Sequence, residues 1–253
     1  MQPSFSCSVL LAALLLAPAP AGAQGWNGRF LIGANAVMQT TSSTFEDDFT
    51  YAHPYTVNIP GEEASVQSRY EVPTGVLFDG GAAVRLIGNL GAGVAASISS
   101  RTGDLAITAR IPHPLLIASH RAVEGTVAAR HEEVAVHVNA VYVVPASARL
   151  HFALSGGPTY FRVEQRLAKT VSVSEAYPYD TATFSNAQLE PERESGWGFN
   201  AAVDLAWMFR PHFGVGGLLR YSRATLTLSP TGRQPRDIEV GGLNAGAGAR
   251  ISF

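Results

Sequence analysis

Histidines and carboxylates are the residues of this chain that could bind a metal or catalyse a reaction, and their spacing fits neither task. The sequence has seven histidines and one cysteine, and no two histidines have the close, repeated spacing of a structural zinc site. His113 lies between Pro112 and Pro114, which fix an extended turn, so we expect a rigid loop element there. We therefore predict no metal, no cofactor and no catalytic residue.

A site that modifies lipids or peptides would need a nucleophile or an activated water beside a base, at one edge of a membrane. No His-x-Ser triplet occurs on any predicted strand. Asp79 and Asp204 are expected to lie deep in the protein and apart from each other, unlike the paired acids at the rim of a protease. We predict that the chain is not an enzyme.

Two segments carry residues suited to recognition. Tyr177, Tyr179 and Asp180 surround a proline, and aromatic side chains on a stiffened loop suit contact with a partner or a sugar. The same tyrosines could instead pack the loop against its neighbours. An acidic segment could hold divalent cations between lipopolysaccharide phosphates, or it could be a solvated loop. Its members are Glu46, Asp47, Asp48, Glu62 and Glu63.

The elements that must position these residues alternate apolar and polar side chains with the period of two that marks a β-strand. In segment 195–209, for example, Trp197, Leu205 and Trp207 share one face with the other large apolar residues. Each such segment has the about 9–11 residues that a transmembrane strand needs. Eight are predicted: 26–40, 67–86, 90–101, 131–144, 149–164, 195–209, 213–228 and 237–253.

The connections between these segments alternate in length. Short turns at 88–89, 145–148 and 210–212 consist mainly of turn-forming residues. The other connections are predicted to be long loops, at about 41–66, 102–130 and 165–194, with a shorter one at 229–236. Short turns on one side and long loops on the other are typical of a barrel with periplasmic turns and extracellular loops.

Residues 1–23 are predicted to be a cleaved signal peptide. Val9 to Pro18 form a short apolar core, and Ala21-Gly22-Ala23 is a small-residue cleavage site. The apolar run is too short to span a bilayer as a helix, which takes about 20 residues. The remaining chain, 24–253, has no cysteine, and the net charge of −2 gives no indication of a nucleic-acid partner.

The alternating last segment and its final Phe253 resemble the C-terminal assembly signal of bacterial outer-membrane barrels. With the strand pattern, the chain resembles the outer-membrane β-barrel domain family, in particular the small eight-stranded barrels of the OmpA and OmpX type. The resemblance implies an all-β, eight-stranded antiparallel up-and-down transmembrane β-barrel over 24–253, located in the bacterial outer membrane. It also implies contact with outer-membrane lipid, with lipopolysaccharide and with the barrel-assembly machinery.

Aromatic residues are predicted to form two girdles at the edges of the membrane. Trp197 and Trp207 lie about 33 Å apart along a strand, at roughly 3.3 Å per residue. A strand tilt of about 45° projects this to about 23 Å, close to the apolar band of about 25 Å. Trp26, Phe209, Phe213 and Phe253 would join Trp207, and Tyr70, Tyr160 and Tyr221 would join Trp197.

The inside of an eight-stranded barrel holds only its own side chains, so we expect no open pore. Asp204 and Arg220 are expected to form an ion pair between adjacent strands, because an unpaired buried charge is costly. We interpret the polar cluster at the inward positions as structural, with a gate or a proton path as the alternative. Its members are Arg29, Asp79, Arg85, His137, Asp204, Arg220 and Arg250.

These patterns favour an integral outer-membrane barrel with a plugged polar lumen. It would present its extracellular loops for envelope integrity, adhesion or surface interaction, to an extracellular ligand that the sequence does not name. The alternative is a narrow channel, or a lateral transporter for small apolar compounds like that of the OmpW type. A transporter should have an apolar or open upper lumen, whereas this chain is expected to place Asn, His and charged residues there.

Overall fold

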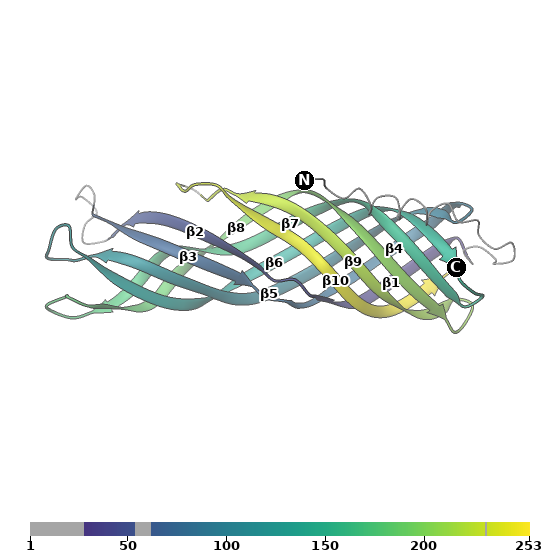
Figure 1. Ribbon diagram of the computed structural model, residues 1–253, viewed down its shortest axis with the longest axis horizontal. Coiled ribbons are helices and arrows are strands. Elements are labelled where there is room, and N and C mark those ends of the chain that lie inside the picture. The colour runs from purple at the N-terminus through teal and green to yellow at the C-terminus, as the bar shows by residue number, and fades with distance from the viewer. Residues whose placement is uncertain (1–27, 54–61, 231) are drawn as a thin grey trace, which may run out of the picture.

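The computed structural model describes residues 28–53, 62–230 and 232–253, which form an elongated β-structure (Figure 1). The predicted signal peptide, 1–23, and the predicted girdle residue Trp26 lie outside the described residues. Among the residues described, no helix is long and apolar enough to cross a membrane. The strands are β1 (Phe30–Gln39), β2 (Ser43–Ala52), β3 (Glu63–Val72), β4 (Gly75–Ile87), β5 (Leu90–Pro112), β6 (His120–Pro145), β7 (Leu150–Glu175), β8 (Ala182–Met208), β9 (Phe213–Leu228) and β10 (Arg236–Ser252).

Eight of these strands close into a ring in which each strand pairs with two antiparallel neighbours. The order around the ring is β1, β4, β5, β6, β7, β8, β9 and β10, and β10 pairs with β1 again. The predicted eight-stranded antiparallel barrel is confirmed. Three short turns, at 88–89, 146–149 and 209–212, lie at one end, which we call the short-turn end.

The remaining two strands form a hairpin that continues β1 and β4 away from the short-turn end. β3 pairs with β5 from Ser65 opposite Arg110 to Tyr70 opposite Leu105. The single strand predicted over 67–86 is therefore divided, because β3 ends at Val72 and β4 begins at Gly75. Pro73 lies at the break, and proline has no N–H to donate to a strand ladder.

The outer wall of the barrel is apolar over the half that adjoins the short-turn end. A closed ring satisfies the backbone hydrogen bonds of its strands, so such a wall can face lipid. The large apolar side chains exposed on this wall, which we call the apolar band, include Phe30, Ile32, Val76, Phe78, Val94, Ile98, Val134, Val138, Phe152, Tyr160, Trp197, Phe199, Val203, Leu205, Trp207, Val215, Leu219 and Tyr221.

Four strands continue far beyond the apolar band. β5, β6, β7 and β8 contain 23, 26, 26 and 27 residues, whereas crossing a membrane takes about 9–11. Along β5 and β6 the apolar band ends at Ile98 opposite Val134, and the ladder continues to Pro112 opposite His120. At roughly 3.3 Å per residue these fourteen residues add about 46 Å along the strand. We call this part of the barrel the extension.

The extension corrects the prediction of long loops. Most residues of 41–66, 102–130 and 165–194 that the structure describes are in strands, and only 113–119 and 176–181 remain as turns beyond β5 and β7. The physical reason is that the alternation persists there with its apolar residues facing inward. The shorter connection predicted at 229–236 agrees with the structure, because β10 begins at Arg236.

The interior of the extension is an apolar core. Its largest fully buried side chains include Tyr70, Phe161 and Leu105. The girdle position predicted for Tyr70 is therefore wrong: its ring stacks on Phe45 with centroids 4.5 Å apart, and its hydroxyl accepts the N–H of Ala168 at 2.6 Å. Burial raises the pKa of the Tyr70 hydroxyl to about 12. The upper lumen is thus filled in two layers. Just above the apolar band the expectation of polar and charged residues holds, because Arg101 and His131 are buried there and hydrogen-bond to Gln39 and Gln165. In the core beyond that layer the expectation is wrong, because the interior there is mainly apolar.

Candidate functional site

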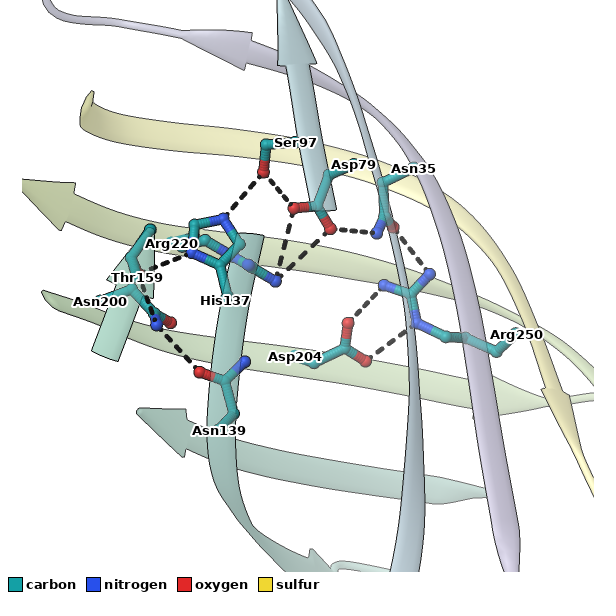
Figure 2. Close-up of polar contacts among 10 residues, drawn as sticks. All are labelled: Asn35, Asp79, Ser97, His137, Asn139, Thr159, Asn200, Asp204, Arg220 and Arg250. Atoms are coloured by element: carbon teal, nitrogen blue, oxygen red, sulfur yellow. Dashed lines mark hydrogen bonds and ion pairs between the residues drawn. The ribbon is translucent and has the colours of Figure 1, made fainter. Parts of the chain in front are cut away.

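Two ion pairs cross the lumen at the level of the apolar band (Figure 2). Arg220 Nη2 on β9 lies 3.4 Å from Asp79 Oδ2 on β4, and both side chains are buried. Arg250 Nε on β10 donates to Asp204 Oδ1 on β8 at 2.9 Å. The negative charges of the two acids and the positive charges of the two arginines cancel, so these four side chains give the lumen no net charge.

The predicted pairing of Asp204 with Arg220 is wrong, although β8 and β9 are neighbours. The register places Asp204 two residues nearer the short-turn end than the residue opposite Arg220. The side chain of Arg250 reaches Asp204 from that end, because it lies over two glycines. A Cβ on Gly216 would lie 2.8 Å from Arg250 Nε, and one on Gly33 would lie 3.5 Å from the same guanidinium.

A buried amide joins the two ion pairs. Arg250 Nη1 donates to Asn35 Oδ1 at 2.7 Å, and Asn35 Nδ2 lies 3.4 Å from Asp79 Oδ1. Removal of any of these side chains would therefore leave a polar partner without a hydrogen bond inside the barrel, which is costly.

A second group of polar side chains extends this network toward β6, β7 and β8. Ser97 Oγ lies 2.7 Å from the carboxylate of the first ion pair and 3.1 Å from His137 Nε2. His137 Nδ1 lies 2.8 Å from Thr159 Oγ1. Asn200 Nδ2 donates to Thr159 Oγ1 at 3.0 Å and to Asn139 Oδ1 at 2.9 Å. These residues and the two ion pairs form one continuous set, which we call the lumen network.

The lumen network does not have the order of a hydrolytic triad. In a triad the histidine takes the serine proton and the aspartate orients the histidine. Here Asp79 contacts Ser97 directly, on the other side from His137, and all three residues are buried. The arrangement links strands of the barrel to each other across the lumen.

Not every predicted member belongs to the lumen network. Arg29 and Arg85 are exposed at the short-turn end, because they lie beyond the enclosed part of the lumen. Ser97 and Thr159 belong to the network but were not among the predicted site residues. Both occupy inward positions of predicted strands, so alternation was the signal that could have found them.

The acidic segment is not a solvated loop. Most of it is strand β2. Two of its carboxylates pair with arginines at and just before the start of β10: Asp47 with Arg233 at 2.9 Å and Asp48 with Arg236 at 2.5 Å. Glu62 lies just before β3 and accepts a backbone N–H from the β5–β6 turn. Within the described chain, no group of three or more His, Cys, Asp or Glu side chains is arranged to hold a metal ion.

The predicted recognition residues lie at the far end of the extension, in the β7–β8 turn. The rings of Tyr177 and Tyr179 meet edge to face with centroids 6.1 Å apart. Arg121 Nη1 donates to the Tyr179 carbonyl at 3.0 Å, and His113 Nε2 lies 3.8 Å from Asp180 Oδ1. The two turns at this end are therefore linked to each other.

The neighbouring β5–β6 turn was not predicted to be a recognition element. Leu115, Leu116 and Ile117 expose 62%, 54% and 78% of their surface, and Tyr177 exposes 80%. His113 Nδ1 accepts the backbone N–H groups of Leu115 and Leu116 at 3.1 and 3.2 Å, as befits a rigid loop element. We call Leu115, Leu116, Ile117 and Tyr177 the apolar tip.

The described aromatic girdle residues point outward at the two ends of the apolar band. Trp197 and Tyr160 contact each other with ring centroids 5.3 Å apart, and Phe199 and Tyr221 with centroids 6.1 Å apart. At the short-turn end the exposed aromatic residues include Trp207, Phe209, Phe213 and Phe253.

A closed ring of eight antiparallel strands, with an apolar outer wall and a polar interior at the same level, defines the architecture of a small outer-membrane β-barrel. No family model and no curated protein matches the sequence.

Solved structures do show similarity. The outer-membrane protein OprG from Pseudomonas aeruginosa has 12% sequence identity over 90% of this chain and 97% of that chain, with a TM-score of 0.49. Neisserial surface protein A has 12% identity over 88% and 97%, with a TM-score of 0.41. Ail, the attachment invasion locus protein of Yersinia pestis, has 12% identity over 89% and 99%, with a TM-score of 0.37.

Proposed function

We propose that this chain is an integral protein of the bacterial outer membrane that does not conduct solutes and that holds the apolar tip outside the cell for surface interaction. In this orientation the short-turn end is periplasmic and the extension is extracellular. The observation that carries the proposal is the apolar tip at the end of a core-filled extension.

The filled interior supports a non-conducting role. At the level of the apolar band, the lumen network occupies the space between opposite strands with paired, mutually hydrogen-bonded side chains. Above it the core of the extension is closed by fully buried residues such as Phe161 and Leu105. The inside of an eight-stranded barrel is filled mainly by its own side chains, so we expect no continuous path for a solute from one end to the other.

The apolar tip supports surface interaction. It lies about 46 Å along the strands from the edge of the apolar band, at roughly 3.3 Å per residue, so the membrane cannot cover it. Exposed apolar patches on otherwise polar surfaces mark interaction sites. The two turns that carry the tip are linked through Arg121 and His113, and such links reduce the ordering entropy that would oppose binding.

Adhesion of cells that display the protein tests this proposal. Leu115→Ser, Leu116→Ser and Ile117→Ser together should abolish retention on a hydrocarbon-coated surface. A matched control replaces three exposed alanines on the flank of the same hairpin, as Ala106→Ser, Ala122→Ser and Ala128→Ser, and should adhere like the wild type. Equal surface display is checked with an epitope tag. Adhesion that survives the tip substitutions would refute the proposal.

A seam in the extension favours a second candidate, lateral passage of small apolar compounds. In the described residues, pairing of the first strand with β10 stops where Thr40 donates its N–H to the Leu243 carbonyl. Beyond that point, β2 pairs only with β3. A cavity of about 230 Å³ lies at the seam, beside Ser42 and Gly242. Uptake of a small apolar dye into proteoliposomes at a rate above that of empty liposomes would favour this candidate over a closed barrel.

A further inference from the structure

A cavity of about 360 Å³ opens at the short-turn end of the lumen, beneath the Asp204–Arg250 pair. Its volume falls at the lower end of the about 300–1,000 Å³ that is usual for small-molecule sites. The extracellular side of the cavity is closed by the lumen network, so any ligand must enter from the short-turn end. We call this cavity the vestibule.

The middle of the vestibule is apolar. Leu31, Val143 and Met208 line it from β1, β6 and β8, and Val143 and Met208 are buried. Water in such a space finds few hydrogen-bond partners on these side chains, so an apolar group is the better occupant.

The mouth of the vestibule is cationic. Arg149 and Arg210 line it from the two neighbouring turns, which are tied together by the bond from the Met208 N–H to the Arg149 carbonyl at 2.8 Å. The acid that lines the cavity, Asp204, is already paired with Arg250. In the described segments 28–31, 84–91, 144–153, 205–214 and 250–253, which form this end, there are five arginines and no Asp or Glu; of these, Arg250 is the one paired with Asp204. A negatively charged group at the mouth would therefore be attracted and not repelled.

A half-buried histidine adds a shielded ring nitrogen that has no hydrogen-bond partner. His151 Nδ1 is shielded from solvent and makes no hydrogen bond, and the residue lines the vestibule between the arginines and the Asp204–Arg250 pair. A buried polar atom left unpaired costs free energy that a bound ligand would recover.

We propose that the vestibule binds a small amphiphilic anion, whose carboxylate or phosphate pairs with Arg149 and Arg210 and whose apolar part lies against Leu31, Val143 and Met208. The shared chemistry fits a free organic acid in the periplasm as well as the head of an anionic lipid. The inference rests on the proposed function only in that both assign the short-turn end to the periplasm. If the adhesion experiment fails, the proposed binding of an anion is not affected.

Methionine methyl resonances report on the site directly. The described chain has two methionines: Met208 is 8% exposed and faces the vestibule, whereas Met38 is 53% exposed on the outer wall. In protein labelled with ¹³C-methyl methionine and held in phosphatidylcholine nanodiscs, sodium octanoate should move the Met208 resonance saturably and leave Met38 in place. Neutral 1-octanol, which enters the lipid without a charge, should not reproduce the shift.

Paired variants separate recognition of the anion from general electrostatics. Arg149→Gln with Arg210→Gln should raise the apparent Kd for octanoate about tenfold, as expected for the loss of charge-assisted hydrogen bonds. Arg29→Gln with Arg85→Gln removes the same charge from the same end at residues that do not line the vestibule, and should leave binding unchanged. Ala206→Leu, which fills part of the vestibule while keeping its charges, should abolish the shift.

Two further arms distinguish the source of the anion. Nanodiscs that contain phosphatidylglycerol should shift Met208 and compete with octanoate if lipid is the occupant, and should do neither if a free acid is. The proposal is overturned if octanoate leaves Met208 in place, if 1-octanol acts equally well, or if both arginine pairs weaken binding to the same extent. It is also overturned if inorganic phosphate alone shifts Met208 and octanoate does not.

Discussion

Loss of one acid from the lumen network should destabilise the barrel. The amount should depend on how deeply the remaining arginine is buried and on which hydrogen bonds it still makes. Asp79→Ala leaves Arg220 buried with its Nε and Nη1 already lacking hydrogen bonds, so we expect the upper part of the range for a broken buried pair, about 5 kcal/mol. Asp204→Ala should cost less, about 3 kcal/mol, because the Asp204 side chain is 19% exposed and Arg250 keeps Asn35.

Double-mutant cycles then test which residues are partners. Asp204→Leu combined with Arg250→Met removes both charges, so we expect a coupling energy of about 2 kcal/mol or more between these positions. Asp204→Leu combined with Arg220→Met breaks two different pairs, and the coupling there should stay below about 1 kcal/mol.

The assay is equilibrium unfolding by urea in lipid vesicles. Tryptophan fluorescence reports the transition because Trp197 and Trp207 lie on the lipid-facing wall and become solvated when the barrel unfolds. If Asp204 couples more strongly to Arg220 than to Arg250, the pairing described above is wrong. If Asp204→Ala proves more damaging than Asp79→Ala, burial is the wrong basis for ranking the two pairs.

Three further results are expected. Tyr70 should make unfolding free energy fall above about pH 10 and level off near pH 12, by about 1.4 kcal/mol per pH unit, because the unfolded state releases the Tyr70 proton first. In urea titrations Tyr70→Phe should show a smaller fall, which comes from the raised pKa of Tyr51, and the double variant Tyr51→Phe/Tyr70→Phe a smaller one still. Among the described residues, chymotrypsin added to intact cells should cut in the turns 113–119 and 176–181, as mapped by mass spectrometry, and cleavage near Phe209 would instead reverse the topology. Gly216→Ala should destabilise the barrel in urea, because the new Cβ would lie 2.6 Å from the Leu205 carbonyl oxygen. A urea unfolding curve like that of the wild type would show that the backbone shifts to make room for the methyl group.

The sequence sufficed to predict the half of the barrel that carries the apolar band. Alternation in segments such as 195–209 reveals which side chains face outward, and a strict period of two leaves the register little freedom. The pairing inside the lumen could not be predicted in this way. An arginine side chain reaches across two strands, so the partner of Arg250 depends on the stagger of the closed ring and on the space over Gly216.

The extension escaped prediction because its polarity is inverted. On β5, Val94 and Ile98 face outward and are apolar, and the outward positions continue in phase as Thr108 and Arg110, which are polar. The inward positions change in the opposite sense, from polar residues within the apolar band to apolar residues, such as Leu105, in the extension. A search for apolar residues on the outer face therefore stops at Ile98, although the strand does not.

This inversion has one cause, the change of solvent along the strand. Within lipid nothing drives apolar side chains inward, and polar groups that cannot face hydrocarbon gather inside, as the lumen network does. In water the hydrophobic effect reverses the preference, and the interior becomes the apolar core around Phe161. The level of Ile98 and Val134 thus marks where the strands leave the membrane. Above it the extension has a core of its own, which is why it can hold the apolar tip in a fixed position far from the lipid.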